Sequence, residues 1–370
     1  MRLTLIISLL LAGLNWSYSQ GVEGKSYELY SQKEWKQLIH FSDSVFETGT
    51  DYYYFRLRYA IAHFELGKYH KAIREFKKAR SFNSAESVAQ EYIYYCLLYQ
   101  GLSDEALRYS KKLPVDTKAR LDSLRKNEIN IGFMSNRSEI PDSLGHVNIL
   151  QASIPIHLGT AIKITPGVSS LTQQKSFGML RQSNFDLQTK LTLSPHYSLN
   201  YSFNNVKSSI LFTEYRSKLH SIGFKLRIRA TTFAPYYGKG LLNNNSFYQY
   251  GMSWKQQLLP YNRLTYTGAF HVNSLNETAH YHQLDIKIHR RWYFSINASF
   301  GDIVYNNLLG ESTVLNNSID KTVFRFSPSI VYYGNNVNFW LGYQYTINQV
   351  YNQSIKYHYK GIYSGISLKF

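Results

Sequence analysis

The sequence predicts an α + β protein of two domains, a small helical repeat domain followed by an antiparallel transmembrane β-barrel of about 12 strands. Three observations predict this arrangement. An apolar leader begins the chain, apolar residues recur at helical spacing over 31–126, and alternation of period 2 runs from about residue 129 to the last residue. The predicted boundaries are 1–19 for a signal peptide, 20–128 for the helical domain and 129–370 for the barrel.

The leader MRLTLIISLLLAGLNWSYSQ carries Arg2 and then an apolar stretch over 3–14. That stretch has the length of a signal-peptide core and is too short to span a bilayer. Small residues at Ser17 and Ser19 predict cleavage before Gln20, so the mature protein is exported; the alternative is a retained membrane anchor. The single cysteine, Cys96, excludes an internal disulfide and a thiolate metal cluster.

The composition is polar on average but rich in aromatic residues. The chain has 33 Tyr and 21 Phe, yet its mean hydropathy is −0.33. A polar lumen and aromatic girdles give barrels this composition. The charge is concentrated in residues 129–370, which hold 22 Lys and Arg against 9 Asp and Glu. Export argues against nucleic acid as the partner and favours lipopolysaccharide, acidic polysaccharide or phospholipid headgroups.

The helical domain contains an internal repeat. GKYHKAIREFKKA (67–79) is answered by GLSDEALRYSKKL (101–113), with a period of 34 residues. This stretch resembles the tetratricopeptide repeat, and 33–46, with Trp35, resembles a weaker earlier copy. The matching positions are Gly67, Tyr69, Ala72, Phe76 and Ala79 in one copy and Gly101 and Ala106 in the next. The resemblance implies a concave face for a periplasmic protein partner; a generic helical hairpin domain, or a cap without a partner, is the alternative.

Ten-residue alternating segments fill the rest of the chain. NFDLQTKLTLS (184–194) and SIGFKLRIRAT (221–231) are examples, and YYGKGLLNNNS (236–246) is interpreted as a polar connection between strands. At about twenty residues for each strand and connection, 129–370 gives about 12 strands, with a range of about 10 to 14. A soluble β-sandwich is the alternative, but it would face its apolar residues inward.

The chain ends on GIYSGISLKF, a strand with one apolar face. Because unpaired backbone groups are not tolerated in hydrocarbon, the last strand is expected to close against the first, near Ile129. Ile366, Leu368 and Phe370 resemble the signal read by the machinery that assembles bacterial outer-membrane barrels. The whole chain resembles Gram-negative outer-membrane proteins with a short tetratricopeptide module, including the YaiO family and, in architecture only, the exopolysaccharide secretion porins. The resemblance implies an outer-membrane location with the helical domain in the periplasm.

Alternation places a set of cations inside the barrel, with Asp186 and Asp285 among the few acids positioned to pair with them. The predicted lumen cations are Lys190, Lys225, Arg227, Arg229, Lys287 and Arg325. Such a lining favours anions and predicts a narrow, non-enzymatic channel, export or envelope-assembly component. The alternative is that these side chains only hold the barrel shut.

Two other function classes stay open. One is a lipid hydrolase in the barrel wall using Ser and His, for which His280 and His282 near His271 are candidates; the chain has no G-x-S-x-G or H-E-x-x-H motif. The other is a surface adhesin or scaffold that works through loops 234–246 and 303–320. HRRWYF (289–294) is interpreted as a strand turn in the aromatic girdle. No cofactor or metal is predicted.

Overall fold

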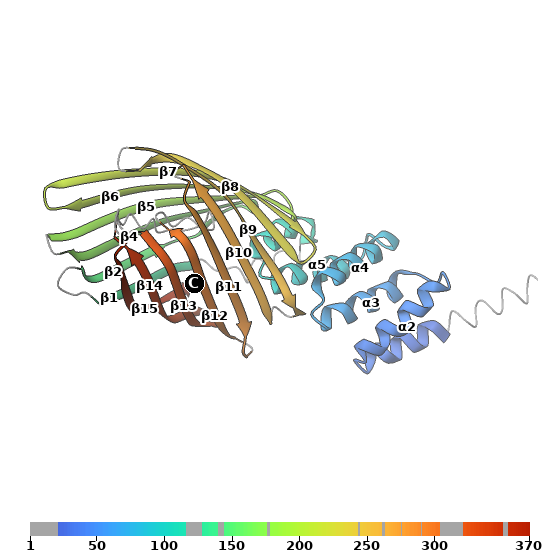
Figure 1. Ribbon diagram of the computed structural model, residues 1–370. Helices are drawn as coiled ribbons and strands as arrows, with labels where there is room; N and C mark the ends of the chain where they lie inside the picture. Colours follow the sequence, from blue (N-terminus) through green and yellow to red (C-terminus); the bar gives the residue numbers. More distant parts are fainter. Residues whose placement is uncertain are drawn as a thin grey trace, which may run out of the picture. The chain divides into compact units, whose positions relative to one another are not determined.

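The computed structural model describes residues 21–115, 128–139, 144–175, 178–242, 245–260, 263–274, 276–289, 291–303, 321–350 and 354–370. The chain divides into two compact units, Met1–Arg120 and Leu121–Phe370 (Figure 1). The predicted signal peptide and most of the predicted loop 303–320 lie outside the described residues.

The first unit is entirely helical in its described residues. Residues 21–31 are helical and are followed by α2 (Trp35–Glu47), α3 (Tyr53–Glu65), α4 (Tyr69–Phe82), α5 (Val88–Tyr99), α6 (Ser103–Tyr109) and the short 3₁₀ turn η1 (Ser110–Lys112). Every second helix therefore begins 34 residues after the one before it, at Trp35, Tyr69 and Ser103.

The three turns that precede these helices share one geometry. Lys33, Gly67 and Gly101 all have positive φ, at 61°, 69° and 73°. In each turn the next residue's N–H donates to the carbonyl five residues back, at 2.9 Å for Glu34 to Leu29 and 3.0 Å for Leu102 to Leu97. This is the Schellman helix end, which glycine favours because it has no Cβ. The unit is thus a threefold repeat of a capped helix pair.

The repeat extends to the packing. The 34-residue series Leu38, Ala72 and Ala106 is fully buried. Two further series with the same spacing are also buried. One is Ser42, Phe76 and Ser110, and the other is Val45, Ala79 and Leu113. Small side chains at these places let the paired helices approach, and Phe76 stacks on Tyr92 of α5 at a centroid distance of 5.0 Å.

A buried histidine should make this unit acid-sensitive. His63 on α3 is 3% exposed, and burial, aided by Lys71 and Lys68, lowers its pKa to about 4 from 6.5. Between pH 6.5 and 4 the unfolded chain therefore binds a proton at His63 that the folded unit excludes. The stability that neutral, buried His63 contributes is complete above pH 6.5 and is lost as pH falls toward 4. We expect the free energy of unfolding of the helical unit to fall by at most about 3 kcal/mol across that window.

Urea titrations of the full-length protein in detergent, followed by far-UV circular dichroism, measure this loss. His63→Phe keeps an aromatic ring beside Tyr59, whose ring centroid lies 4.7 Å away, and should flatten the dependence between pH 6.5 and 4. Glu23 and Glu75 have pKa values below 4.5, so their losses begin only at lower pH. An unchanged slope in His63→Phe would assign the acid sensitivity to another group.

The second unit is a β-sheet whose strands are antiparallel throughout. Its strands are β1 (Glu128–Ser138), β2 (Leu144–Ser153), β3 (Ile156–Leu158), β4 (Ile162–Lys175), β5 (Gly178–Thr192), β6 (Tyr197–Ile210), β7 (Thr213–Ile228), β8 (Thr231–Leu242), β9 (Asn245–Leu259), β10 (Leu264–Asn273), β11 (Thr278–Lys287), β12 (Trp292–Ile303), β13 (Lys321–Tyr333), β14 (Val337–Gln349) and β15 (Lys356–Lys369).

The sheet closes into a barrel. β1 pairs with β15, beside which it lies in Figure 1. Ile131 is opposite Ile366 and Glu128 is opposite Lys369. β2 pairs with both β1 and β4. The short β3 pairs with the start of β4, beyond the end of β2. The described strands therefore form a ring of 14. The predicted closure of the last strand on the first is confirmed, whereas the predicted count of about 12 is too low.

Short turns explain the higher count. β6 and β7 are joined through 211–212, and β7 and β8 through 229–230. Of the segment 236–246, interpreted as a connection, residues 236–242 lie in β8 and 245–246 in β9. Its glycines mark close strand approach, because a Cβ at Gly240 would lie 1.8 Å from the carbonyl oxygen of Lys218. The predicted loop 234–246 is therefore wrong.

The barrel has the polarity expected of a membrane-embedded protein. Large apolar side chains such as Val168, Ile222 and Leu341 are exposed on its outer face, while polar inward side chains such as Asn204 and Gln249 are buried. A soluble sandwich has the reverse arrangement. The alternation predicted from the sequence thus has its apolar side outward.

Candidate functional site

Inward-facing cations gather at one end of the barrel. We call this end, where β1 begins at Glu128 and β15 ends at Lys369, the terminal rim. On β4, β5, β7, β9, β11 and β15, seven cations lie in phase with buried inward residues, each among the five residues of its strand nearest that end. They are Lys163, Lys190, Lys225, Arg227, Lys255, Lys287 and Lys369, the last of which lies opposite the inward acid Glu128.

Two of these cations face each other directly. Lys163 on β4 and Lys190 on β5 are register partners. Like charges directly opposite in a sheet repel each other unless other groups compensate them. A cluster of positive charge at a narrow opening raises the local concentration of anions. The terminal rim therefore concentrates positive charge on the inner face of the barrel.

The predicted lumen cations divide between three places. Lys190, Lys225, Arg227 and Lys287 belong to the terminal rim, and Arg325 lies deeper, on β13. Arg229 does not face the lumen: it is exposed in the turn between β7 and β8 with φ of 56°. The alternation that predicted it continued one residue past the end of β7. Lys163, Lys255 and Lys369 were missed, although IKI, WKQ and SLK carry the same alternation.

The two acids do not pair with these cations. Asp285 accepts hydrogen bonds from Gln283 Nε2 and Ser295 Oγ, both at 2.7 Å. Asp186 is buried beside Gly167, and neither of its carboxylate oxygens has a hydrogen-bond partner among the described residues. The expectation that these acids neutralise the basic lining is therefore wrong for the described part of the chain.

The middle of the barrel is packed. Inward side chains of β6, β9, β10 and β12, including Asn204, Gln249, His271 and Ser299, are inaccessible to water. An open aqueous pore would leave such side chains wet. The barrel is therefore unlike a wide porin, and its accessible interior space lies elsewhere.

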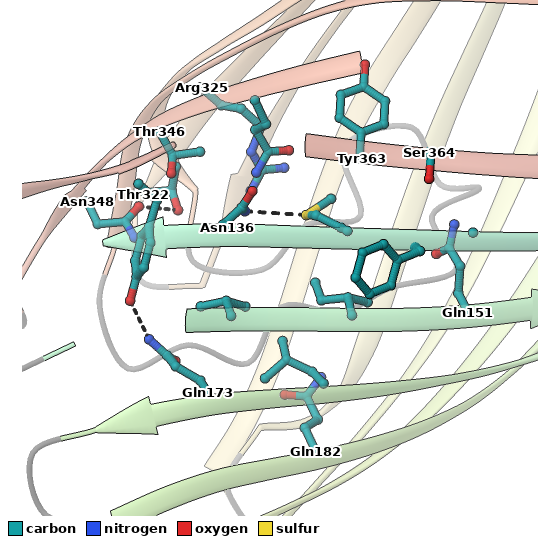
Figure 2. Close-up of a pocket in the computed structure, with 18 of the residues that line it drawn as sticks. Asn136, Gln151, Gln173, Gln182, Thr322, Arg325, Thr346, Asn348, Tyr363 and Ser364 are labelled. Carbon is teal, nitrogen blue, oxygen red and sulfur yellow. Dashed lines mark hydrogen bonds between the residues drawn. The ribbon is translucent and has the colours of Figure 1, made fainter. Parts of the chain in front are cut away.

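One cavity of about 220 Å³ lies inside the barrel wall formed by β1, β2, β4, β5 and β13 to β15 (Figure 2). Its polar wall includes Gln173, whose Nε2 donates to Tyr359 Oη at 2.6 Å, and Thr322, which donates to Asn348 Oδ1 at 2.9 Å. Arg325 also lines it. The sequence did not reveal this cavity, because its lining comes from seven strands far apart in the chain.

The three histidines proposed for a hydrolase do not share a face. His271 faces inward and is buried, opposite Ala279. His280 and His282 lie opposite Phe270 and Gly268, on the outward side of the same strand pair. His280 and His282 therefore share one strand face as predicted, but His271 lies on the opposite face of the sheet.

Outward histidines are instead satisfied by tyrosines across the strands. Tyr266 and His282 Nδ1 are 2.7 Å apart, as are Tyr345 and His358 Nδ1, and Tyr201 lies 2.8 Å from His220 Nδ1. On a lipid-facing surface each such bond covers polar groups that hydrocarbon cannot solvate.

The ends of the barrel carry the predicted aromatic and terminal features. Residues 288, 289 and 291 lie between β11 and β12, and Trp292 packs on Tyr332 at 4.9 Å between centroids on the outer face. Ile366, Leu368 and Phe370 are exposed, with the first two on the outward side of β15. Their role in assembly stays a prediction.

Two further features bear on function. Among the residues that the structure describes, no three His, Cys, Asp or Glu side chains gather as a metal site. No helix in that part of the chain combines the length and the apolar character needed to cross a bilayer.

Comparison with family models and with curated proteins finds no match. The barrel is similar to solved structures. A monoaromatic hydrocarbon channel, CymD, matches at 8% identity and a TM-score of 0.47 over 73% of this chain and 92% of its own. The Pseudomonas putida toluene transporter TodX matches at 7% and 0.45, over 74% and 93%. Omp33 of Acinetobacter baumannii matches at 9% and 0.42, over 66% and 99%. At these values the likeness identifies no substrate for this chain.

Proposed function

We propose that this protein is a non-enzymatic barrel of a bacterial outer membrane, a narrow channel or export component selective for anions. The observation that carries the proposal is the excess of inward cations at the terminal rim, seven against the single acid Glu128, at the mouth of a closed barrel with an apolar outer face. The packed middle makes passage selective rather than free. On this proposal the surrounding partners are outer-membrane lipid and lipopolysaccharide, with Ile366, Leu368 and Phe370 presented to the assembly machinery.

We further propose that the helical unit is a tetratricopeptide-like docking module in the periplasm. The three Schellman turns spaced by 34 residues and the buried small residues at Ala72, Ala79 and Ala106 support this. Stacked helix pairs of this kind present a concave face for a peptide or protein. Such a module would bring a periplasmic partner to the barrel.

Ion selectivity in planar bilayers tests the channel. We expect the reversal potential under a KCl gradient to indicate preference for chloride. Lys190→Glu combined with Lys225→Glu should lower the chloride to potassium permeability ratio at least about tenfold, because each unit charge near the ion path contributes roughly 1 kcal/mol.

Lys218→Glu is the matched control. Lys218 lies on the exposed outer side of β7, so the same charge change there should leave the ratio nearly unchanged. Cation preference in the unaltered protein, or no conductance at any voltage, would rule out the anion channel.

A further inference from the structure

The outer face of the barrel carries a basic patch at the end opposite the terminal rim. Five exposed cations stand on β5, β6, β7 and β8, which are neighbours in the sheet (Figure 1). In their strands they alternate with buried inward residues such as Gln182 and Ser217, so they face away from the lumen. The five, which we call the outer basic patch, are Arg181, Lys207, Arg216, Lys218 and Lys239.

The charge of the outer basic patch is largely unbalanced. Glu214 is the only acid on the outward side of these four strands in the described chain, and its carboxylate pairs with Lys207 Nζ at 2.8 Å. Arg216, the register partner of Lys207, adds a second cation beside that pair. The other three cations have no ion-pair partner among the described residues. The patch therefore presents positive charge to whatever covers the outer face.

The level of the patch matches the second interface of a membrane. About 9–11 residues of a tilted strand cross the hydrocarbon layer. Lys207 lies ten residues from Tyr197, where β6 begins at the terminal rim, and Lys218 lies ten residues from Ile228, where β7 ends there. The outward side chains between these limits are mainly apolar or aromatic. The cations of the patch therefore stand where lipid headgroups begin.

Cations at this level suit a lipid that carries several phosphates. Lysine and arginine form charge-assisted hydrogen bonds with phosphate oxygens, and outward Phe203 and Ile222, next to the patch, can contact the acyl chains. Neighbouring strands are 4.7–4.9 Å apart, so the patch extends about 14 Å from β5 to β8. A headgroup with one phosphate can use only part of this width. An acylated disaccharide with a phosphate at each end can use both sides of it.

The patch lies on the outer-leaflet side in the proposed orientation. The helical unit precedes β1 in the chain, and β1 begins at the terminal rim. With that unit in the periplasm, the opposite end of the barrel faces the leaflet that contains lipopolysaccharide. We infer that the outer basic patch binds lipopolysaccharide through the phosphates of its acylated disaccharide. This inference rests on the proposed outer-membrane location and is independent of ion selectivity.

Lipids that differ in phosphate number test this site. Native mass spectrometry of the full-length protein in detergent would compare diphosphorylated lipid A, monophosphorylated lipid A and phosphatidylglycerol. We expect diphosphorylated lipid A to bind at least about tenfold more tightly than either, because its second phosphate engages further cations. Its affinity should also fall as the salt concentration rises. Equal binding of all three lipids would indicate a general attraction of anionic lipid and would overturn the inference.

Arg216→Gln combined with Lys239→Gln should weaken binding of diphosphorylated lipid A at least about tenfold. Arg291→Gln is the matched control, because Arg291 is exposed between β11 and β12 at the terminal rim and donates to Asn335 Oδ1 at 3.1 Å. Heat-modifiable migration on gels confirms that each variant forms a barrel. An unchanged affinity in the folded double variant would overturn the inference. Should that variant not fold, the comparison of the three lipids on the unaltered protein decides.

The two proposals can fail separately. Absence of a preference for diphosphorylated lipid A with intact chloride selectivity would defeat only the lipid site. Preference for that lipid without selective conductance would defeat only the channel. Planar bilayers prepared without lipopolysaccharide leave the outer basic patch without its ligand, so Lys218→Glu stays a matched control for ion selectivity.

Discussion

Leu341→Arg should lower the free energy of unfolding of the barrel in lipid vesicles by about 2–4 kcal/mol. Leu341 lies two residues from the middle of β14 on the outer face, 56% exposed. In a bilayer that exposed surface contacts hydrocarbon, where an arginine near the midplane costs about this much. In a soluble protein the same substitution at an exposed site changes stability by less than about 0.5 kcal/mol. Urea unfolding followed by tryptophan fluorescence measures the difference.

Ile288→Arg is the depth control. Ile288 is 62% exposed and directly follows β11 at the terminal rim. An arginine near the interface reaches water and phosphate, so the cost there should be about 0–1 kcal/mol. Equal small effects at both positions would mean that the outer face is not in lipid, and the inverted polarity would need another explanation.

The barrel could be predicted because a strand with alternating apolar residues turns its apolar side outward in a membrane barrel and inward in a soluble protein. The sequence of 221–231 already places Ile222 and Phe224 on one side and Lys225 on the other. Strand number could not be predicted as well, because it depends on turn length. Gly238 and Gly240 are typical of loops, yet both are strand positions. At Gly240 the backbone of Lys218 leaves no room for a Cβ, and at Gly238 a Cβ would lie 2.8 Å from Ser221 Oγ.

The first helical repeat along the chain, which contains Lys33, could be recognised only partly in the sequence. Lys33 stands where Gly67 and Gly101 stand in the other copies, and it adopts their positive φ at 61°. Local sequence preference disfavours this conformation for lysine. The neighbouring bond from Glu34 to Leu29 and the burial of Leu38 hold it in place. Tertiary packing therefore preserves a repeat whose glycine signature is lost.

The candidate site was predicted only where it follows strand phase. Lys190, Lys225 and Arg227 at the terminal rim follow from alternation within single strands. The cavity does not, because Gln173 and Tyr359 are 186 residues apart and meet only through closure of β1 on β15. Register between distant strands decides which inward side chains share a space, and one sequence does not specify it.

Arg56→Met should lower the free energy of unfolding of the helical unit by about 3–5 kcal/mol. Arg56 Nη1 donates to Glu75 Oε2 at 2.9 Å, its Nε donates to Asp51 Oδ1 at 2.9 Å, and its guanidinium lies 3.6 Å from the Phe46 ring centroid. Burial alone raises the pKa of Glu75, but Arg74, Lys78 and Arg56 outweigh it and hold the pKa below 4.5. Removing the buried partner leaves the Glu75 carboxylate with only the exposed cations Arg74 and Lys78, whose attraction water screens, and this approaches the costly case of a broken buried pair.

Two variants separate this pair from ordinary surface charge. Arg74 also contacts Glu75 at 2.9 Å, but its side chain is exposed, so Arg74→Met should cost less than about 1 kcal/mol. Adding Glu75→Leu to Arg56→Met removes the stranded charge and should recover most of the loss. Urea titration of the full-length protein, followed by far-UV circular dichroism, compares all three. If Arg56→Met and Arg74→Met cost the same, the α3–α4 contact is held by packing of Phe76 and Ala72 alone. The buried ion pair would then have no structural role in the repeat.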